Sequence, residues 1–233
     1  GYRGTIQWQQ SATINGTYSN MAGRTSDTLI ISNLTANRYY RAFVTNGACT
    51  ATSTAVGITV DPLSVGGTLS GSKTVCTGTN SSAMSLTGNV GTIVRWESST
   101  DSFATNVTDI ANTISSYTAS GLTQTTYFRA VVTSGVCASA NSSTATITVN
   151  ATSVGGTATL TTTSPICTGT NSTTFSLSGH TGSVTKWQWS STSNFATATD
   201  VVSTSTTLTV TNLTASRYYR AVVTSGVCAA DNS

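Results

Sequence analysis

One stretch of eleven residues recurs three times along the chain and constrains the fold more than any other feature. It reads YFRAVVTSGVC over Tyr127–Cys137 and returns as YYRAVVTSGVC over Tyr218–Cys228. A looser copy, YYRAFVTNGAC, spans Tyr39–Cys49. The closing cysteines are 88 residues (49 to 137) and 91 residues (137 to 228) apart. A sequence with such a period predicts an array of similar modules.

Apolar and polar side chains alternate along this stretch, which predicts a β-strand with one buried face. The residues assigned to the core face are Tyr40, Ala42, Val44, Phe128, Ala130, Val132, Tyr219, Ala221 and Val223. The opposite face carries Tyr39, Arg41, Tyr127, Arg129, Tyr218 and Arg220. Because arginine is rarely buried without a partner, we expect this second face to be solvated or used for contacts.

The composition favours an all-β chain. Hydrophobic residues make up 37% of it and the net charge is only +3, whereas disorder needs low hydrophobicity with high charge. No segment shows a helical period, and β-branched residues are abundant. Each complete module shows about seven short strands with turn signals between them, which fits an immunoglobulin-like β-sandwich.

The repeats predict three domains joined by very short segments. These are a truncated repeat at residues 1–61, a complete repeat at 62–151, and a repeat lacking its last strand at 152–233. They are called modules one, two and three below. Since the chain opens and stops in mid-repeat, we expect it to be part of a longer array. Short joints limit bending, so the tandem sandwiches are expected to form an elongated, semi-rigid rod.

Tryptophans and cysteines keep fixed intervals. Trp96 and Trp187 each follow a cysteine by 20 residues, and Trp8, like them, precedes a later cysteine by 41. We predict that these three tryptophans fill the module cores. Trp189 is expected on the same face as Trp187, so which of the two fills the core position stays open.

Two cysteine pairs have equal spacing. Cys76 and Cys137 are 61 residues apart, as are Cys167 and Cys228. Equal spacing favours two disulfides within modules and an oxidising compartment, with Cys49 unpaired because its counterpart would precede Gly1. The strand assignment, however, places each pair far apart along its sandwich. Either the strand boundaries are wrong or the cysteines stay free, and we favour the bridges.

Sites for catalysis, metals and nucleic acid are not indicated. His180 is the only histidine, and no pair of acids recurs in every module, so we expect no enzyme and no cofactor. Asp109 and Asp200 match between modules but lack the clustered carboxylates that calcium needs. The ten Lys and Arg residues form no basic run, and no apolar stretch reaches membrane-spanning length.

The outward tyrosines and arginines allow two interpretations. An aromatic ring beside a guanidinium could hold a sugar ring or a carboxylate. The simpler interpretation is a structural cross-strand ladder, with each pair contributing about 0.2–1 kcal/mol. We favour the ladder because a feature repeated in every module suits a requirement of the fold.

Four phrases resemble a known class of repeat. They are VCTGTNS (Val75–Ser81), VRWESS (Val94–Ser99), LTQTTYFRAVV (Leu122–Val132) and SGVC (Ser134–Cys137). The whole chain is similar to repeats of very large surface proteins of Bacteroidetes, and most of all to the gliding-motility adhesins of flavobacteria. The resemblance implies a filament that the type IX system exports and that is anchored at the outer membrane. The resemblance identifies no binding residue in this chain.

The resemblance and the residue pattern together predict a structural spacer of a cell-surface adhesin filament. Its partners would be further repeats of the same chain and, through a distal tip, surface polysaccharide. One alternative is a carbohydrate-binding segment that grips polysaccharide through the Tyr/Arg faces. Another is an accessory immunoglobulin-like module of a secreted enzyme.

Overall fold

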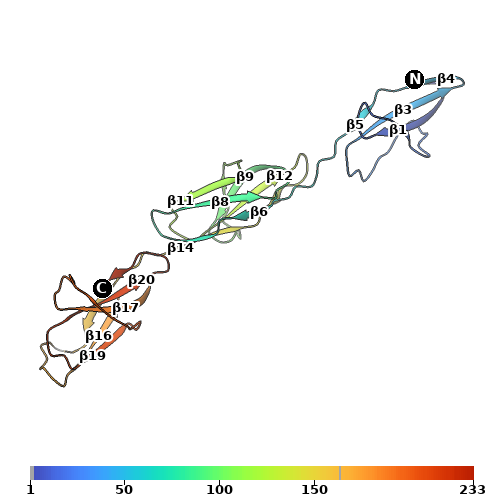
Figure 1. Cartoon of the computed structure of the whole chain (residues 1–233). Coiled ribbons are helices and arrows are strands. Elements are labelled where there is room, and N and C mark those ends of the chain that lie inside the picture. Colours follow the sequence, from blue (N-terminus) through green and yellow to red (C-terminus); the bar gives the residue numbers. More distant parts are fainter. Residues whose placement is uncertain (1–2, 163) are drawn as a thin grey trace. The chain divides into compact units, whose positions relative to one another are not determined.

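The computed structural model describes residues 3–162 and 164–233. Within these ranges every regular element is a β-strand and no helix is present (Figure 1), so the all-β prediction is confirmed. The strands fall into three groups that follow the sequence repeats.

Module one contains β1 (Thr5–Ser11), β2 (Ser19–Asn20), β3 (Arg38–Asn46), β4 (Cys49–Thr52) and β5 (Val56–Ile58). Module two contains β6 (Thr68–Ser70), β7 (Lys73–Cys76), β8 (Ser81–Thr87), β9 (Thr92–Ser99), β10 (Thr108–Ile110), β11 (Ser116–Ser120), β12 (Thr126–Thr133), β13 (Ala140–Asn141) and β14 (Ala145–Asn150). Module three contains β15 (Thr157–Leu160), β16 (Ser172–Ser178), β17 (Ser183–Ser190), β18 (Thr199–Val201), β19 (Thr207–Thr211), β20 (Tyr218–Thr224) and β21 (Asp231–Asn232).

Module two is an immunoglobulin-like β-sandwich of two sheets. One sheet has the strand order β11-β8-β6, and the other has the order β10-β9-β12-β14-β7, with β13 paired to β12. Along β8 every second residue is buried, as a strand with one face against a core requires. The buried residues between the sheets are Leu69, Val75, Met84, Leu86, Trp96, Ala119, Phe128, Ala130, Val132, Ala145 and Ile147.

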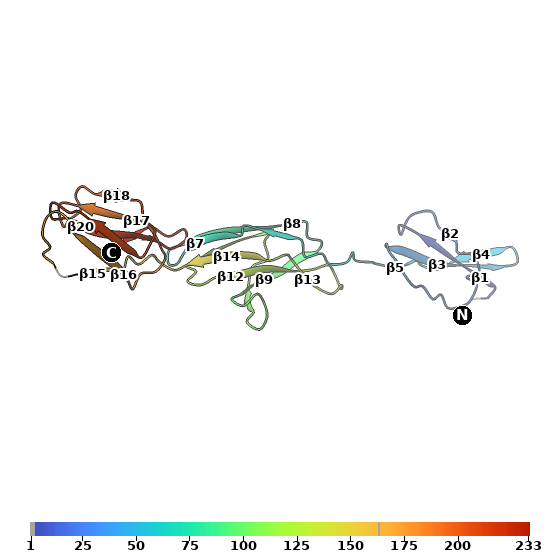
Figure 2. The ribbon, with the colours of Figure 1, turned by 90° about the horizontal axis from the view of Figure 1, so that it is seen from below.

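The first strand of module two changes sheets part-way along. β6 pairs with β8. β7 runs parallel to β14 in the other sheet, where Figure 2 labels both strands. Gly71 lies between them at a φ of +107°, and an added Cβ there would lie 2.5 Å from the Ala83 carbonyl oxygen. Only glycine fits this crossing. The register then places Cys76 opposite Asn150, the last residue of β14.

Module three repeats this architecture with sheets β15-β16-β19 and β18-β17-β20-β21. Its core contains Phe175, Leu177, Val184, Trp187, Leu208, Ala221 and Val223. In module two, β14 lies beside β12. Among the residues described in module three, no strand takes the equivalent position beside β20.

Module one has a single sheet in the described residues, with the order β2-β1-β3-β4 and β5 also paired to β3. Without a second sheet over it, Trp8 is only partly buried, so its assignment to a core is wrong. Tyr40 is buried, but Ala42 and Val44, also predicted for a core, are partly exposed for the same reason.

Backbone contacts group the chain into two units. One consists of Gly1–Ser64 with Thr133–Ala138, and the other of Val65–Val132 with Ser139–Ser233. Modules two and three therefore belong to one unit, except for the turn after β12.

Candidate functional site

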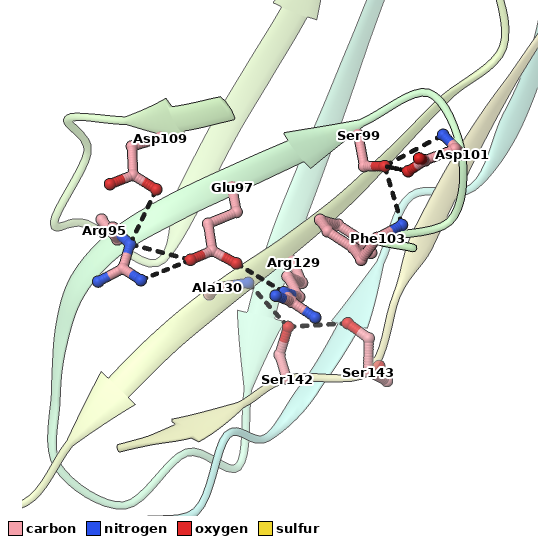
Figure 3. Close-up of polar contacts among 10 residues, drawn as sticks. All are labelled: Arg95, Glu97, Ser99, Asp101, Phe103, Asp109, Arg129, Ala130, Ser142 and Ser143. Carbon is pink, nitrogen blue, oxygen red and sulfur yellow. Dashed lines mark hydrogen bonds and ion pairs between the residues drawn. The ribbon is translucent and has the colours of Figure 1, made fainter. Parts of the chain in front are cut away.

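A row of polar side chains crosses three strands on the face of module two that points away from the core (Figure 3). The Arg129 Nε atom on β12 donates to Glu97 Oε2 on β9 at 2.7 Å. Arg95 Nη2 donates to the other carboxylate oxygen, Glu97 Oε1, at 2.6 Å, and Arg95 Nε reaches Asp109 Oδ1 on β10 at 3.1 Å. Glu97 is 3% exposed, so its charge is held between two guanidinium groups.

An aromatic ring from the loop after β9 covers the arginine of this row. The Arg129 Cζ atom lies 4.1 Å from the centroid of the Phe103 ring. Phe103 has a φ of +66°, in the left-handed region that bulky residues rarely adopt. Hydrogen bonds within the loop hold this conformation, because Asp101 accepts from the backbone N–H groups of Thr105 and Asn106.

Modules one and three build the same row with neutral amides. Arg41 Nε donates to Gln9 Oε1 at 2.8 Å, and its Cζ lies 4.0 Å from the Tyr18 ring centroid. Arg220 Nε donates to Gln188 Oε1 at 2.9 Å. Its Cζ lies 4.3 Å from the centroid of Phe195, which again has a positive φ, of +52°.

The arginines at positions 41, 129 and 220 are thus all partly buried and engaged within their own modules. Each guanidinium has a ring on one side and an acceptor on the neighbouring strand. This geometry is that of a structural cross-strand ladder. The tyrosines of the same predicted face differ: Tyr39 and Tyr127 are partly buried, whereas Tyr218 is 48% exposed.

The row alters the pKa of the Glu97 carboxyl. Burial by itself raises this pKa, but the hydrogen bonds and charges of Arg129 and Arg95 outweigh burial, and the net pKa is lowered. The Asp101 carboxyl has a strongly lowered pKa because Thr105 and Ser99 donate hydrogen bonds to it. Both groups are therefore carboxylates at neutral pH.

Arg129→Ala is expected to destabilise module two by about 1–3 kcal/mol, because it leaves one oxygen of a buried carboxylate without its charged partner. Arg220→Ala is the matched control. It removes a hydrogen bond to a neutral amide and is expected to cost about 0.5–1.5 kcal/mol. Calorimetric unfolding of both variants measures the difference, and equal losses would show that the Glu97 charge does not matter.

Glu97→Gln is expected to reduce the stability of module two at pH 7 but not under acidic conditions. The folded pKa of Glu97 lies below the unfolded value, so its contribution is complete above the unfolded pKa, near 4.3, and is lost as pH falls through the folded pKa. Unfolding curves from pH 7 down to pH 3 measure this. The gap between wild type and variant should shrink with acidity, and a constant gap would contradict the assignment.

The tryptophan at the equivalent position of each module makes a hydrogen bond that recurs. Trp96 and Trp187 are 0% exposed, which identifies Trp187 as the core residue of module three. Trp189 instead lies partly exposed under the Arg217 guanidinium, 3.8 Å from it. The Nε1 atoms of Trp8, Trp96 and Trp187 each donate to a carbonyl 18 residues later, those of Ser26, Ile114 and Ser205.

The cysteines pair differently from the prediction. Cys76 and Cys228 form a disulfide, whereas Cys49, Cys137 and Cys167 are free thiols. The predicted pairs Cys76–Cys137 and Cys167–Cys228 are therefore wrong. The bridge links module two to module three instead of closing a loop within one module.

The strand directions explain why the pairing within a module fails. Cys76 lies opposite Asn150, at the end of β14. β12 runs antiparallel to β14, with Phe128 opposite Ala145, so it leads away from Asn150 toward the turn that holds Cys137. Eight residues of β12, at about 3.3 Å each, separate the two ends by roughly 25 Å. A disulfide spans only about 4–7 Å between Cα atoms.

The joint, defined as residues 150–153 with the turn 225–228, brings the bridged cysteines together. The Val227 N–H donates to Asn150 Oδ1 at 3.2 Å, and the Ser225 N–H donates to Ser153 Oγ at 2.8 Å. Gly226 has a φ of +53°, and an added Cβ would lie 2.1 Å from Asn150 Oδ1. The turn of module three is therefore fixed directly beside the residue that pairs with Cys76.

The same contacts recur around the turn that holds the free Cys137. The Val136 N–H donates to Asp61 Oδ2 at 3.1 Å, and the Ser134 N–H donates to Ser64 Oγ at 2.9 Å. These pairs correspond one by one to those of the joint.

Cys76 and Cys167 occupy equivalent positions near the start of their modules and are called the first-strand cysteines below; their backbones share a contact with an asparagine. Asn80 Nδ2 donates to the carbonyls of Cys76 and Leu122, and Asn80 Oδ1 accepts from the Leu122 N–H. Asn171 makes the same contacts with Cys167 and Leu213 in module three. This explains the asparagine of the Cys-Thr-Gly-Thr-Asn phrase: it holds the cysteine backbone in place, whether or not the thiol is paired.

One family covers nearly the whole chain. The family described as "Domain of unknown function (DUF8696)" matches it three times, over residues 1–62, 65–151 and 154–233. The chain belongs to this family. No curated protein matches the chain. Among solved structures, the chain is similar to the FN1–FN3 domains of chicken CNTN1, with 12% identity and a TM-score of 0.32 over 99% of this chain and 87% of that one.

In this DUF8696 chain, the described residues contain no cluster of three His, Cys, Asp or Glu side chains that could hold a metal ion. They also contain no helix long and apolar enough to cross a membrane. A cavity of about 690 Å³ lies in module three, lined among others by Ile166, Phe175, Leu213, Tyr218 and Tyr219. The corresponding edge in module two is filled by β14.

Proposed function

We propose that the chain is a spacer segment of a cell-surface adhesin filament and carries tension between the cell and a distal tip during gliding and surface attachment. The disulfide between Cys76 and Cys228 carries this proposal, because it crosses from one module to the next. A bridge that served only the stability of one module would lie within that module.

The bridge gives tension a covalent path across the joint. Force that enters along β7 passes through the two sulfur atoms into the turn of module three, and bypasses the segment between the two cysteines, whose sequence separation is 152. That segment includes most of the core of module two and the whole core of module three. The modules would therefore stay folded under a load that would otherwise pull strands out of them.

The chemistry of the bridge and the sequence resemblance support the proposed location. A structural disulfide fits an extracellular or otherwise oxidising compartment. The repeat phrases resemble those of the flavobacterial gliding-motility adhesin SprB, which supports a filament exported by the type IX system. In this proposal the segment has no catalytic role, and its partners are neighbouring repeats and, through the tip, surface polysaccharide.

Small-angle scattering of the oxidised chain tests the spacer proposal. A spacer needs extended modules, and a rod of about 90–110 Å would give a radius of gyration of roughly 26–32 Å. A value near 17 Å, about that of one compact domain of this length, would contradict the proposal.

Carbohydrate binding is a second candidate, favoured by the exposed Tyr218 next to the ring-stacked Arg220 in module three. Screening the chain on a polysaccharide array tests it. Binding that is lost in Tyr218→Ala and kept in Tyr39→Ala would support a sugar site. The spacer proposal expects no binding by either the chain or these variants.

A further inference from the structure

We infer that Cys167 is the attachment point for another module of this family, which would bridge to it through the cysteine of its own turn. The inference extends the proposed spacer function: the Cys76–Cys228 bridge would be one instance of a rule by which each first-strand cysteine pairs with the turn cysteine of the following module. It names the partner of Cys167 as a further copy of the repeat.

One of the contacts that hold the backbone of Cys76 recurs at Cys167. In both modules an asparagine four residues later donates to the cysteine carbonyl, at 2.9 Å in each case. Cys167 is exposed and unpaired, whereas Cys76 is bridged. Module three therefore presents, with the same asparagine contact, the thiol that corresponds to the one module two uses in its bridge.

The cavity of module three lies where β14 lies in module two. In module two the corresponding position is occupied by β14, which pairs with both β12 and β7 and buries Ile147 completely. In module three the edge of β20 at Tyr218 and Tyr219 lines the cavity instead. A strand like β14 leads directly into a joint, so a strand seated there would carry the next module's turn toward Cys167.

The turn cysteines show the complementary half of the rule. Cys137 lies in a turn fixed to Asp61 and Ser64 in the way that the turn of Cys228 is fixed to Asn150 and Ser153. By the rule, its partner is the first-strand cysteine of module one, a position that would precede Gly1 in the numbering. Cys49, the turn cysteine of module one, would likewise pair with a module before it.

Bridge formation needs an oxidant, which we take to be a small-molecule or protein disulfide. The Cys167 thiol and the partner thiol give up two electrons and two protons in total. One disulfide of the oxidant is reduced to two thiols, and one sulfur–sulfur bond forms between the modules. Oxidised glutathione serves in the experiment.

The test extends the chain after Ser233 with a second copy of residues 143–233. The Ala221 N–H bonds to Ser233 Oγ as the Ala130 N–H bonds to Ser142 Oγ, so residue 143 is the natural continuation. In the copy, the exposed Val227 is changed to Ile so that mass distinguishes its turn peptide. After oxidation, unreduced peptides should show Cys76–Cys228, and Cys167 bridged to the Cys228 of the copy.

A second extension makes the test independent of how the added module folds. A copy of residues 62–87 placed before Gly1 supplies the missing first-strand cysteine, which should then bridge to Cys137. Cys49 should remain a thiol in both extended chains and serves as the control. The rule is overturned if the bridges form within modules, or if Cys167 and Cys137 stay thiols in their extended chains while Cys76–Cys228 forms.

Discussion

Trp96→Ala is expected to lower the free energy of unfolding of module two by about 3–5 kcal/mol, the usual cost of removing a fully buried large aromatic side chain. Trp96 is 0% exposed, lies 5.6 Å from the ring centroid of Tyr117, and donates to the Ile114 carbonyl. The substitution leaves a cavity between the sheets and a carbonyl without its donor. Calorimetry measures the loss without depending on the fluorescence that the substitution removes.

Trp189→Ala is the control for this prediction. Its side chain lies on the same face of β17 as that of Trp187, but it is only partly buried and stacks with Arg217, so its loss should cost about 1 kcal/mol or less. A loss for Trp189→Ala as large as for Trp96→Ala would mean that complete burial of Trp96 does not set the cost of removing it.

Cys76→Ser is expected to produce the second large effect. Closing a loop of 152 residues stabilises a chain by at most about 5 kcal/mol in the chain-entropy estimate. Urea unfolding of modules two and three should therefore shift to lower concentration in the variant. Wild type with a reductant should unfold like Cys76→Ser, and the variant itself should not respond to the reductant.

The variants Cys167→Ser and Cys137→Ser distinguish the Cys76–Cys228 bridge from disulfides within modules. Both thiols are free, so neither substitution should change the response to reductant. If either variant unfolded like Cys76→Ser, the bridge between modules would be excluded.

Much of the fold could be predicted because the repeat shows each pattern more than once. The alternation in Tyr127–Thr133 predicts a strand whose Phe128, Ala130 and Val132 face the core, and these residues are buried. The repeated stretch lies at the same distance in sequence after Trp96 and after Trp187, and this constant spacing predicts that both tryptophans are buried. Trp8 fails as a prediction because burial depends on a second sheet, and spacing alone carries no information about that sheet.

The cysteine pairing could not be predicted because spacing alone does not tell which end of a sandwich a residue reaches. Equal intervals of 61 residues fit pairing within modules and between modules equally well. The parallel pairing of β7 with β14 decides the question, since it puts Cys76 at the joint. The Gly71 crossing that separates β6 from β7 was the missing signal.

The polar row was predicted only in part. Alternation placed Arg129 and Glu97 on the outer face, but the burial of Glu97 depends on the loop that brings Phe103 over Arg129. That loop differs in sequence between modules, and its aromatic residue takes a backbone conformation that sequence patterns do not indicate. The recurrence of Tyr18, Phe103 and Phe195 shortly after the core tryptophan was the available signal.

Single-molecule stretching of the chain from its two ends tests the central claim, that a covalent bridge carries tension across the joint. In the oxidised chain the residues between Cys76 and Cys228 should stay hidden from the force, and a reductant should release them. The released 152 residues correspond to about 500 Å of extra extended length. Two separate releases of about 200 Å each would indicate bridges within modules, and no difference between the oxidised and reduced chains would contradict the account altogether.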